Sequence, residues 1–350
     1  MLKSFRYFLF PFSLLYGATV WARNQLYDRR IFKSAQFNFP IICVGNLAVG
    51  GTGKTPMTEY LINLLKDRYQ IATLSRGYKR KTKGFAIANE NATAIDIGDE
   101  PMQFHQKFPD ITVAVGEERM VAIPQLLQSK PGTEVIILDD GFQHRMVQAG
   151  LNILLTDYKN LYSRDLMLPA GDLRDIKKSS RRADIIIATK CNHSLTMTEK
   201  ELLQNELQVL PHQSFFCTSI AYGQPYHMFN GSHCTIDSTS DVLLLCGIAN
   251  PKPLKDHLTS ITRSYEMIRF ADHHIFSTDD LVEIKRHFQS IDSSHKIIVT
   301  TEKDAVRLEK FRKEIADFPI YVLPITHQFL LGEEESFKQQ VLTFIEAFKN

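Results

Sequence analysis

The stretch that decides the fold is Ile41-Ile42-Cys43-Val44-Gly45-Asn46-Leu47-Ala48-Val49-Gly50-Gly51-Thr52-Gly53-Lys54-Thr55. Its apolar start predicts a buried strand, and the pattern after it predicts a helix. A strand, a glycine-rich loop and a helix in this order are the context of a phosphate-binding loop, or P-loop. Glycines let backbone N–H groups close around phosphate oxygens, and the helix start adds a positive dipole end. We therefore predict that residues 48–55 bind a nucleoside triphosphate.

Two side chains of this P-loop have expected roles. Lys54 would reach the β- and γ-phosphates, and the hydroxyl of Thr55 would hold Mg²⁺. Pro56 falls in the first helical turn, where it costs no hydrogen bond. The strict pattern has glycine where this chain has Ala48. A glycine-rich turn that binds nothing is the weaker alternative, because the strand and the helix are both present.

Residues 40–190 alternate short apolar runs with helical patterns. The predicted strands are Ile41–Val44, Ile71–Leu74, Ile111–Val115, Val135–Leu138, Leu151–Leu155 and Ile185–Ala188. Met57–Asp67 and Glu118–Gln128 predict crossover helices. The alternation predicts an α/β fold, a P-loop NTPase-like parallel sheet with helices on both faces.

A second, smaller α/β unit is expected further along the chain. Residues 217–241 are rich in small polar residues and read as a connector. After them come the predicted strands Val242–Cys246, Lys296–Thr300 and Ile320–Leu323, the predicted helix Asp279–Gln289, and a helix from about Glu334. We expect three regions: an N-terminal helix over residues 1–33, a P-loop core over 34–225, and a smaller domain over 226–350.

The N-terminal segment is apolar and basic. Residues 7–22 carry no charge, and residues 1–33 hold six basic residues, Lys3 among them, against the single acid Asp28. The run is shorter than the roughly 20 residues of a spanning helix. A cleaved signal peptide is disfavoured because a triphosphate-binding loop follows, which leaves a buried helix or a helix lying in the membrane interface. We favour the interfacial helix, with basic ends on anionic headgroups and with suitably placed aromatic residues Phe5, Tyr7, Phe8, Phe10, Phe12, Tyr16 and Trp21.

Composition excludes little. The 350 residues are 44% hydrophobic and 23% charged, as in an ordinary globular protein, and a net charge of +2 gives no reason to expect a nucleic-acid partner. Five scattered cysteines without a CxxC pair fit a reducing compartment and give no zinc signature.

Acidic residues stand at two further places. Asp139 and Asp140 end the predicted strand Val135–Leu138, where enzymes of this type hold Mg²⁺ and where two carboxylates would repel without a cation. The alternative is a strand end with solvated acids. Asp99 stands in Gly98-Asp99-Glu100-Pro101 before a helix, and its spacing fits an ordinary helix N-cap as well as a functional acid.

Three short motifs remain open. Asp272-His273-His274 invites a metal site, but neighbours on a strand point apart and no further ligand is suitably spaced. Thr189-Lys190-Cys191-Asn192 occupies the position of the guanine-reading Asn-Lys-x-Asp of GTPases, and Asn192 in place of Asp does not support guanine selection. Thr301-Glu302-Lys303-Asp304 ends a strand of the second unit.

Together these motifs resemble the tetraacyldisaccharide 4′-kinase family over nearly the whole chain. Besides the P-loop, the resemblance rests on Ser75-Arg76-Gly77-Tyr78, Gly98-Asp99-Glu100-Pro101, Asp139-Asp140-Gly141-Phe142-Gln143-His144, Leu168-Pro169-Ala170-Gly171 with Leu173-Arg174, Gly247-Ile248-Ala249-Asn250-Pro251, Asp272-His273-His274-Ile275-Phe276 and Thr301-Glu302-Lys303-Asp304. Each motif is weak alone, whereas their order is specific. Ala48 and Asp172 depart slightly from the family pattern.

The resemblance implies phosphoryl transfer from ATP to the 4′-hydroxyl of a tetraacyl disaccharide 1-phosphate, which gives a lipid A precursor at the cytoplasmic face of the inner membrane. It implies Asp99 as general base with His273 as its partner, and Mg²⁺ on Asp139 and Asp140. Weaker candidates for contacting phosphate or sugar are Arg76, Arg119, His144 and Arg174. The competing classes are a nucleotide-driven switch or metal-delivery GTPase, and a membrane-docked ATPase scaffold without small-molecule turnover.

Overall fold

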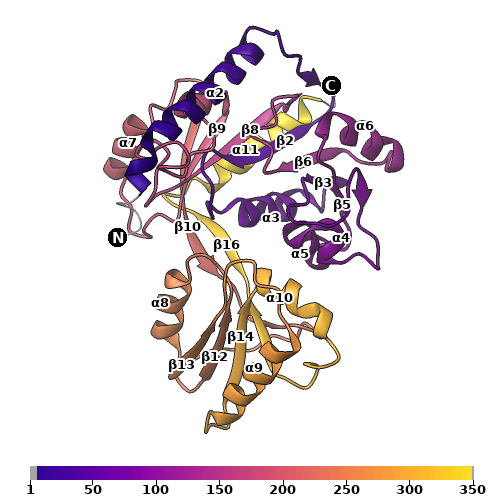
Figure 1. The fold of residues 1–350 in the computed structure, drawn as a ribbon, viewed down its shortest axis with the longest axis vertical. Coiled ribbons are helices and arrows are strands. Elements are labelled where there is room, and N and C mark those ends of the chain that lie inside the picture. The colour runs from indigo at the N-terminus through magenta and orange to yellow at the C-terminus, as the bar shows by residue number, and fades with distance from the viewer. Residues whose placement is uncertain (1–5, 349–350) are drawn as a thin grey trace. The chain divides into compact units, whose positions relative to one another are not determined.

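Residues 6–348 are described by a computed structural model, in which the chain forms two units (Figure 1). The first unit comprises residues up to Ala221 together with those from Thr326 onward, and the second comprises Tyr222–Ile325. Lys3 and Phe5, named above in the N-terminal segment, lie outside the described residues.

The first unit is built on a nine-stranded sheet of order β16-β10-β9-β8-β2-β6-β3-β5-β4. From β10 to β5 neighbouring strands run parallel, and β4 joins antiparallel at the edge. The strands are β2 Ile41–Asn46, β3 Ile71–Ser75, β4 Ala86–Ile87, β5 Thr112–Val115, β6 Val135–Asp139, β8 Leu151–Asp157, β9 Ile185–Thr189, β10 Ser214–Tyr222 and β16 Ile325–Phe329. The six predicted strands of residues 41–188 all lie in this sheet. The prediction of an α/β fold with a parallel sheet is confirmed.

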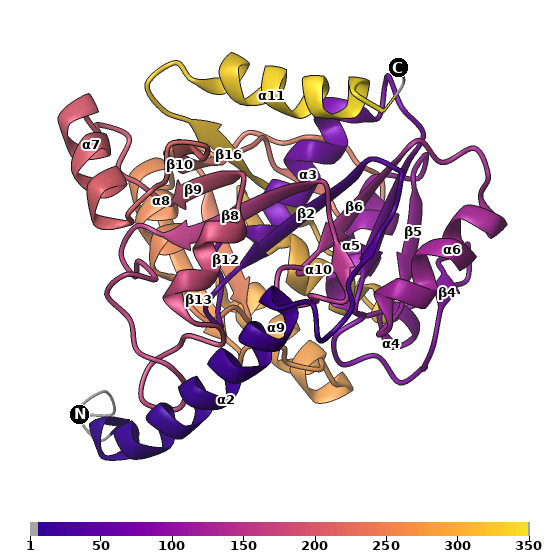
Figure 2. The same cartoon turned by 90° about the horizontal axis from the view of Figure 1, so that it is seen from above.

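Helices flank this sheet on both faces, as the continuously buried strands require. They are α3 Lys54–Leu65, α4 Ala94–Ile97, α5 Asp99–Lys107, α6 Arg119–Ser129, α7 Met197–Glu206 and α11 Glu334–Glu346. A separate two-stranded sheet pairs β1 Ala35–Gln36 with β7 Val147–Gln148. Figure 2 shows α11 and the N-terminal helix α2 on opposite sides of the large sheet.

The second unit has its own five-stranded sheet, of order β11-β15-β14-β12-β13, in which only β11 is antiparallel. Its elements are β11 Tyr226–His227, β12 Asp241–Cys246, α8 Lys252–Ile261, β13 Ser264–Arg269, α9 Thr278–Ser290, β14 Lys296–Thr301, α10 Glu302–Leu308 and β15 Ile320–Leu323. Successive residues of β12 enter different cores, with Leu243 on one face and Val242 and Leu244 on the other. This alternation buries both faces of the strand.

The end of the chain differs from the sequence prediction. Residues 326–350 belong to the first unit rather than to a domain over 226–350, because β16 pairs beside β10 in the large sheet. Phe337 of α11 stacks on Phe329 at 4.6 Å and meets Phe216 of β10 edge-on at 5.6 Å. The predicted connector at residues 217–241 also begins with a strand, since β10 runs to Tyr222. Aromatic and β-branched residues, which favour strands, continue to Tyr222, and the run of small polar residues begins only after them.

The N-terminal helix α2 spans Phe10–Asp28 and turns most of its apolar side chains outward. Phe12 and Leu15 are 62% and 69% exposed, and Phe8, in the turn before the helix, is 78% exposed, whereas Ser13, Val20 and Asn24 are buried. The alternative of an ordinary buried helix is therefore wrong, because such a helix buries its apolar stripe. Within residues 6–348, no helix combines the length and apolar character needed to cross a membrane.

Candidate active site

The P-loop connects the central strand β2 to α3. Gly50 and Gly53 have φ angles of +105° and +88°, a region that side chains strain to enter. A Cβ on Gly53 would also lie 3.0 Å from the ring of His327. The loop therefore needs glycine at position 53 for its backbone conformation and for the room that His327 occupies.

Asp140 is held by two cations at this edge of the sheet. Lys54 Nζ lies 3.7 Å from Asp140 Oδ1, and Arg174 donates to both carboxylate oxygens of Asp140, at 3.0 Å to Oδ2. Burial opposes ionisation of Asp140, but Lys54 and Arg174 outweigh it and hold its pKa well below the usual range. The predicted repulsion between the two neighbouring carboxylates is thus relieved by fixed side chains.

Asp139 has a different environment. Its carboxylate is buried and accepts a hydrogen bond from Thr58 Oγ1 at 3.2 Å. Burial, together with the neighbouring charge of Asp140, raises the pKa of Asp139 to about 6. The two adjacent acids therefore differ in their readiness to carry charge, which the sequence did not indicate.

The residues predicted to hold Mg²⁺ suit that ion. Thr55, Asp139 and Asp140 offer hydroxyl and carboxylate oxygens, the ligands that Mg²⁺ prefers. The raised pKa of Asp139, caused first by burial, means that additional positive charge near it would stabilise its ionised form. No group of three His, Cys, Asp or Glu side chains that could hold a metal occurs among residues 6–348. A small number of protein oxygens is typical of Mg²⁺ sites in which nucleotide phosphates supply the remaining ligands.

Basic groups gather at the end of β6. Arg119 is buried, donates to His144 Nε2 at 3.3 Å and to the carbonyl of Asp139 at 3.4 Å. Burial lowers the pKa of Arg119 to about 10, and burial with the charge of Arg119 lowers that of His144 to about 4. The exposed Arg76 adds to both shifts, so it lies close by. The structure thus brings Arg76, Arg119 and His144 together, as a cluster that can attract anions.

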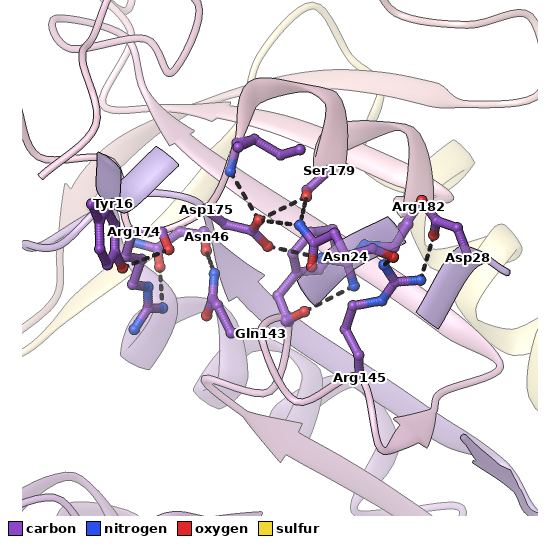
Figure 3. A network of polar contacts seen from close by, with 12 residues as sticks. Tyr16, Asn24, Asp28, Asn46, Gln143, Arg145, Arg174, Asp175, Ser179 and Arg182 are labelled. Carbon is purple, nitrogen blue, oxygen red and sulfur yellow. Dashed lines mark hydrogen bonds and ion pairs between the residues drawn. The ribbon is translucent and has the colours of Figure 1, made fainter. Parts of the chain in front are cut away.

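Asn46 links Arg174 to the P-loop, a connection that the sequence analysis missed. Arg174 donates to Asn46 Oδ1 at 2.5 Å, and Asn46 Nδ2 donates to Thr52 Oγ1 at 2.8 Å. Gln143 donates to the Asn46 carbonyl at 2.5 Å (Figure 3). Helix α2 joins the same segment, since Tyr16 donates to the carbonyl of Arg174 at 3.1 Å.

Asp99 is the first residue of α5, and the N-cap of that helix is Gly98, at φ +94°. The alternative of Asp99 as an ordinary N-cap is therefore wrong. The charge of the next residue, Glu100, contributes to the raised pKa of Asp139 after burial and Asp140. The start of α5 consequently lies near the acidic end of β6.

His273 belongs to the second unit, at the carboxyl edge of its sheet. Arg307 Nη2 donates to His273 Nδ1 at 3.0 Å, and Arg307 pairs with the fully buried Asp304 at 3.1 Å. Asp304 also accepts from the backbone N–H of Gly247 at 2.9 Å. We call Gly247, His273, Asp304 and Arg307 the His273 cluster. The neighbouring His274 instead bonds Asp280 at 2.9 Å, so the two adjacent histidines do not converge on one ligand.

The chain has clear relatives among known proteins. A family model described as "Tetraacyldisaccharide-1-P 4'-kinase" matches residues 5–346. A "Tetraacyldisaccharide 4'-kinase" of Bacteroides thetaiotaomicron is 44% identical over 96% of this chain and 92% of the relative, and one of Flavobacterium johnsoniae is 44% identical over 97% of each. The crystal structure of LpxK from Aquifex aeolicus in complex with ATP superposes with a TM-score of 0.76, at 30% identity, over 99% of this chain and all of that one.

Fold and site together define a P-loop phosphotransferase built on a parallel α/β sheet. The comparisons narrow this class. The chain belongs to the tetraacyldisaccharide 4′-kinase family.

Proposed function

We propose that this chain transfers the γ-phosphoryl group of ATP to the 4′-hydroxyl of tetraacyldisaccharide 1-phosphate, which yields the 1,4′-bisphosphorylated lipid A precursor. The observation that carries the proposal is the family match over residues 5–346, together with a P-loop whose Lys54 stands beside Asp140 and Arg174. Phosphoryl transfer depends on positioning and charge neutralisation, which these groups can provide.

The reaction needs three contributions from the chain. The P-loop, residues 48–55, holds the phosphates, and Lys54 turns from Asp140 to the β- and γ-phosphates when ATP enters. Thr55, Asp139 and Asp140 would hold Mg²⁺, which would supply further neutralisation of phosphate charge. Arg76, Arg119, His144 and Arg174 bind phosphate or sugar oxygens of the two substrates.

Asp99 acts as general base on the acceptor. It takes the proton of the 4′-hydroxyl as that oxygen bonds to the γ-phosphorus and the bond from this phosphorus to the bridging oxygen of ADP breaks. The family resemblance also assigns His273, in the second unit, a part in the proton transfer. Arg307 always donates, so it fixes the tautomer of His273 with the ring proton on Nε2.

A GTPase that switches or delivers metal has less support. Asn192 stands where guanine-reading proteins have Asp, and no metal-holding group of His, Cys, Asp or Glu occurs in the described part of the chain. Lys190 of the same motif contacts the P-loop backbone at Gly51 instead.

The acceptor carries acyl chains and resides in a membrane. Helix α2 is suited to attach the protein to the surface of that membrane. The outward Phe12 and Leu15 of α2, with Phe8 just before it, suit the interface of a bilayer, and basic residues flank the apolar run. We place the protein on the cytoplasmic face of the inner membrane as a peripheral or monotopic protein, where ATP is available.

The kinase activity is tested with radiolabelled ATP and tetraacyldisaccharide 1-phosphate in detergent micelles. We expect labelled lipid from the full chain and almost none from Lys54→Met. ATP hydrolysis without labelled lipid would overturn the proposal in favour of an ATPase scaffold.

Membrane association is tested by flotation with vesicles that contain anionic phospholipid. Replacing Phe12 and Leu15 by Ser should move the protein from the vesicle fraction to the soluble fraction, with the fold kept because both side chains are exposed. Leu202→Ser, at an equally exposed apolar position on α7, is the matched control. Equal flotation of both variants would contradict the interfacial role of α2.

A further inference from the structure

Three consecutive carbonyls of the P-loop each accept a hydrogen bond from a side chain outside the loop. Lys190 Nζ donates to the carbonyl of Gly51, and Thr189 Oγ1 donates to that of Thr52 at 2.9 Å. His327 Nε2 donates to the carbonyl of Gly53 at 2.9 Å. The donors come from the end of β9 and from β16, which are distant in sequence from the loop and from one another.

These contacts control the direction of the loop's N–H groups. In a trans peptide the C=O of one residue and the N–H of the next point in opposite directions, and the only cis peptide bond found among residues 6–348 joins Leu168 to Pro169. Fixing the carbonyls of Thr52 and Gly53 therefore turns the N–H groups of Gly53 and Lys54 away from the three donors. A P-loop binds phosphate with such backbone N–H groups.

The histidine donor is locked in one protonation state. Because a carbonyl can only accept, His327 Nε2 must carry the proton, and Nδ1 must accept from Thr218 Oγ1 at 2.9 Å. Burial, with a smaller contribution from the charge of Lys190, outweighs the hydrogen bond to the Gly53 carbonyl and lowers the pKa of His327 to about 4. His327 is therefore a neutral, single-proton donor across the physiological pH range.

The lysine donor is fixed as well. Lys190 Nζ pairs with Asp157 Oδ2 of β8 at 2.7 Å, so its ammonium group is held between that carboxylate and the P-loop. Thr189 Oγ1 also lies 3.3 Å from the carbonyl of Thr156 on the same strand. Strand β8 is the neighbour of both β2 and β9, so it sets the distance between the donors and the loop.

We propose that Thr189, Lys190 and His327 are positioning residues for ATP, which hold the P-loop carbonyls so that the N–H groups of Gly53 and Lys54 face the phosphates before ATP arrives. They act through the loop backbone and do not touch the nucleotide. Preorganised dipoles of this kind need no reorientation when the charged ligand binds. The proposal rests on the use of ATP at this loop and is independent of the identity of the acceptor.

The first test is a matched pair of substitutions at Thr189. Thr189→Val keeps the shape and removes the hydroxyl, whereas Thr189→Ser keeps the hydroxyl. Loss of one hydrogen bond should raise the Kd for ATP–Mg²⁺, titrated without lipid, about 3- to 10-fold in the Val variant. The Ser variant should stay within about 2-fold of the original chain. With lipid present, KM for ATP should follow the same pattern, and KM for the acceptor should not change.

A second pair keeps the test open if Thr189→Val does not fold. Lys190→Met removes the donor to Gly51, and Asp157→Asn weakens the ion pair while leaving that donor in place. Lys190→Met should weaken ATP binding several-fold more than Asp157→Asn does.

Two results would overturn the proposal. One is equal ATP affinity in Thr189→Val and Thr189→Ser. The other is a drop in Tm of the nucleotide-free variants while the Kd for ATP stays constant, since purely structural contacts would produce it. Because Kd is titrated without acceptor, a failure of the kinase assay leaves this test readable.

Discussion

The P-loop of the first unit and the His273 cluster of the second unit are both built at the carboxyl ends of parallel strands, yet they present different chemical groups. In the P-loop the functional groups that we propose are backbone N–H groups, and side chains from β9 and β16 hold the neighbouring carbonyls. In the His273 cluster the functional group that we propose is a side chain, held by Arg307, which pairs in turn with Asp304. The difference teaches that this chain holds its functional groups in place in two ways. We propose that backbone groups are positioned for the nucleotide, and that a chain of hydrogen-bonded side chains is positioned for the acceptor.

The largest effect is expected from Lys54→Met. It removes one of the two cations that balance Asp140, and the cation that we propose for the phosphates of bound ATP. Loss of a charge-stabilising donor at a reaction centre costs roughly 10²- to 10³-fold in kcat. Initial rates of lipid phosphorylation would reveal it, and a loss below about 10-fold would mean that Lys54 is not part of the transition-state charge balance.

The next largest effect is expected from a substitution that disrupts the His273 cluster. Arg307→Met removes the donor to His273 Nδ1, so the tautomer is no longer fixed. We expect kcat to fall roughly 10-fold or more, the effect of losing a hydrogen bond to a charged group, with KM for ATP little changed. The ¹⁵N chemical shifts of the His273 ring should show loss of the single tautomer.

Arg312→Met is the control for this prediction, because Arg312 pairs with Glu309 nearby in the chain and has a largely exposed side chain. Its kcat should match that of the original chain. If Arg307→Met changed KM for ATP and left kcat unchanged, the His273 cluster would serve the nucleotide rather than the acceptor, and the comparison of the two regions would fail.

A smaller effect distinguishes the contributions to stability of Asp139, which ends β6, and Asp140, which follows it. Asp139 has its pKa raised by burial to about 6, so its ionised form is destabilised in the fold, and stability declines as pH rises from about 4 to 6. Asp139→Asn should therefore raise the free energy of unfolding at pH 7.5, by about 1–3 kcal/mol, and abolish that decline. Thermal melts across pH 4–8, without nucleotide, measure both.

Asp140→Asn should act in the opposite direction. Lys54 and Arg174 outweigh burial and hold the pKa of Asp140 low, so its charge stabilises the fold at neutral pH. This substitution should lower Tm at pH 7.5. A fall in Tm for both variants would contradict the contrast between the two environments.

The smallest effects are expected at a pair of glycines, one in each region. A Cβ at Gly53 would lie 3.0 Å from the His327 ring, and one at Gly247 would lie 2.8 Å from Asp304 Oδ1. Gly53→Ala, strained further by its positive φ, should mainly raise the Kd for ATP, and Gly247→Ala should mainly lower kcat, each about 5- to 10-fold. A swap of these two signatures would show that the regions have been assigned the wrong substrates.

The sequence predicted most of the first sheet and the P-loop, because continuous apolar runs and a glycine-rich loop are local signals. It did not predict β16 or the return of residues 326–350 to the first unit. Seven strands, β10 to β16, lie between residues 214 and 329, and nothing local in Ile325–Phe329 says which sheet it joins. Pairing with β10 is a non-local choice, stabilised by Phe216, Phe329 and Phe337.

The same limit applies to the site. Lys54 closes the glycine-rich loop, and Asp139 and Asp140 stand at the end of an apolar strand, so local signals could find them, whereas His327 reaches Gly53 from a position 274 residues away. Lys190 was noticed in the sequence only as part of an incomplete guanine motif, since strand order, which places β9 two strands from β2, is invisible to spacing. Arg307 stood three residues beyond a noted motif, and only the helical turn of α10 brings it to Asp304.

The return of β16 has a consequence for biosynthesis. A ribosome makes residues 222–325 before it makes His327. Until the second unit has been synthesised, the P-loop therefore lacks one of the side chains that donate hydrogen bonds to its carbonyls. Strand β10 likewise lacks its neighbour β16 during that interval, and the ring of Phe216 lacks its contacts with Phe329 and Phe337. A nascent chain stalled after residue 325 should therefore bind ATP more weakly than the finished protein, which ties nucleotide use to completed translation.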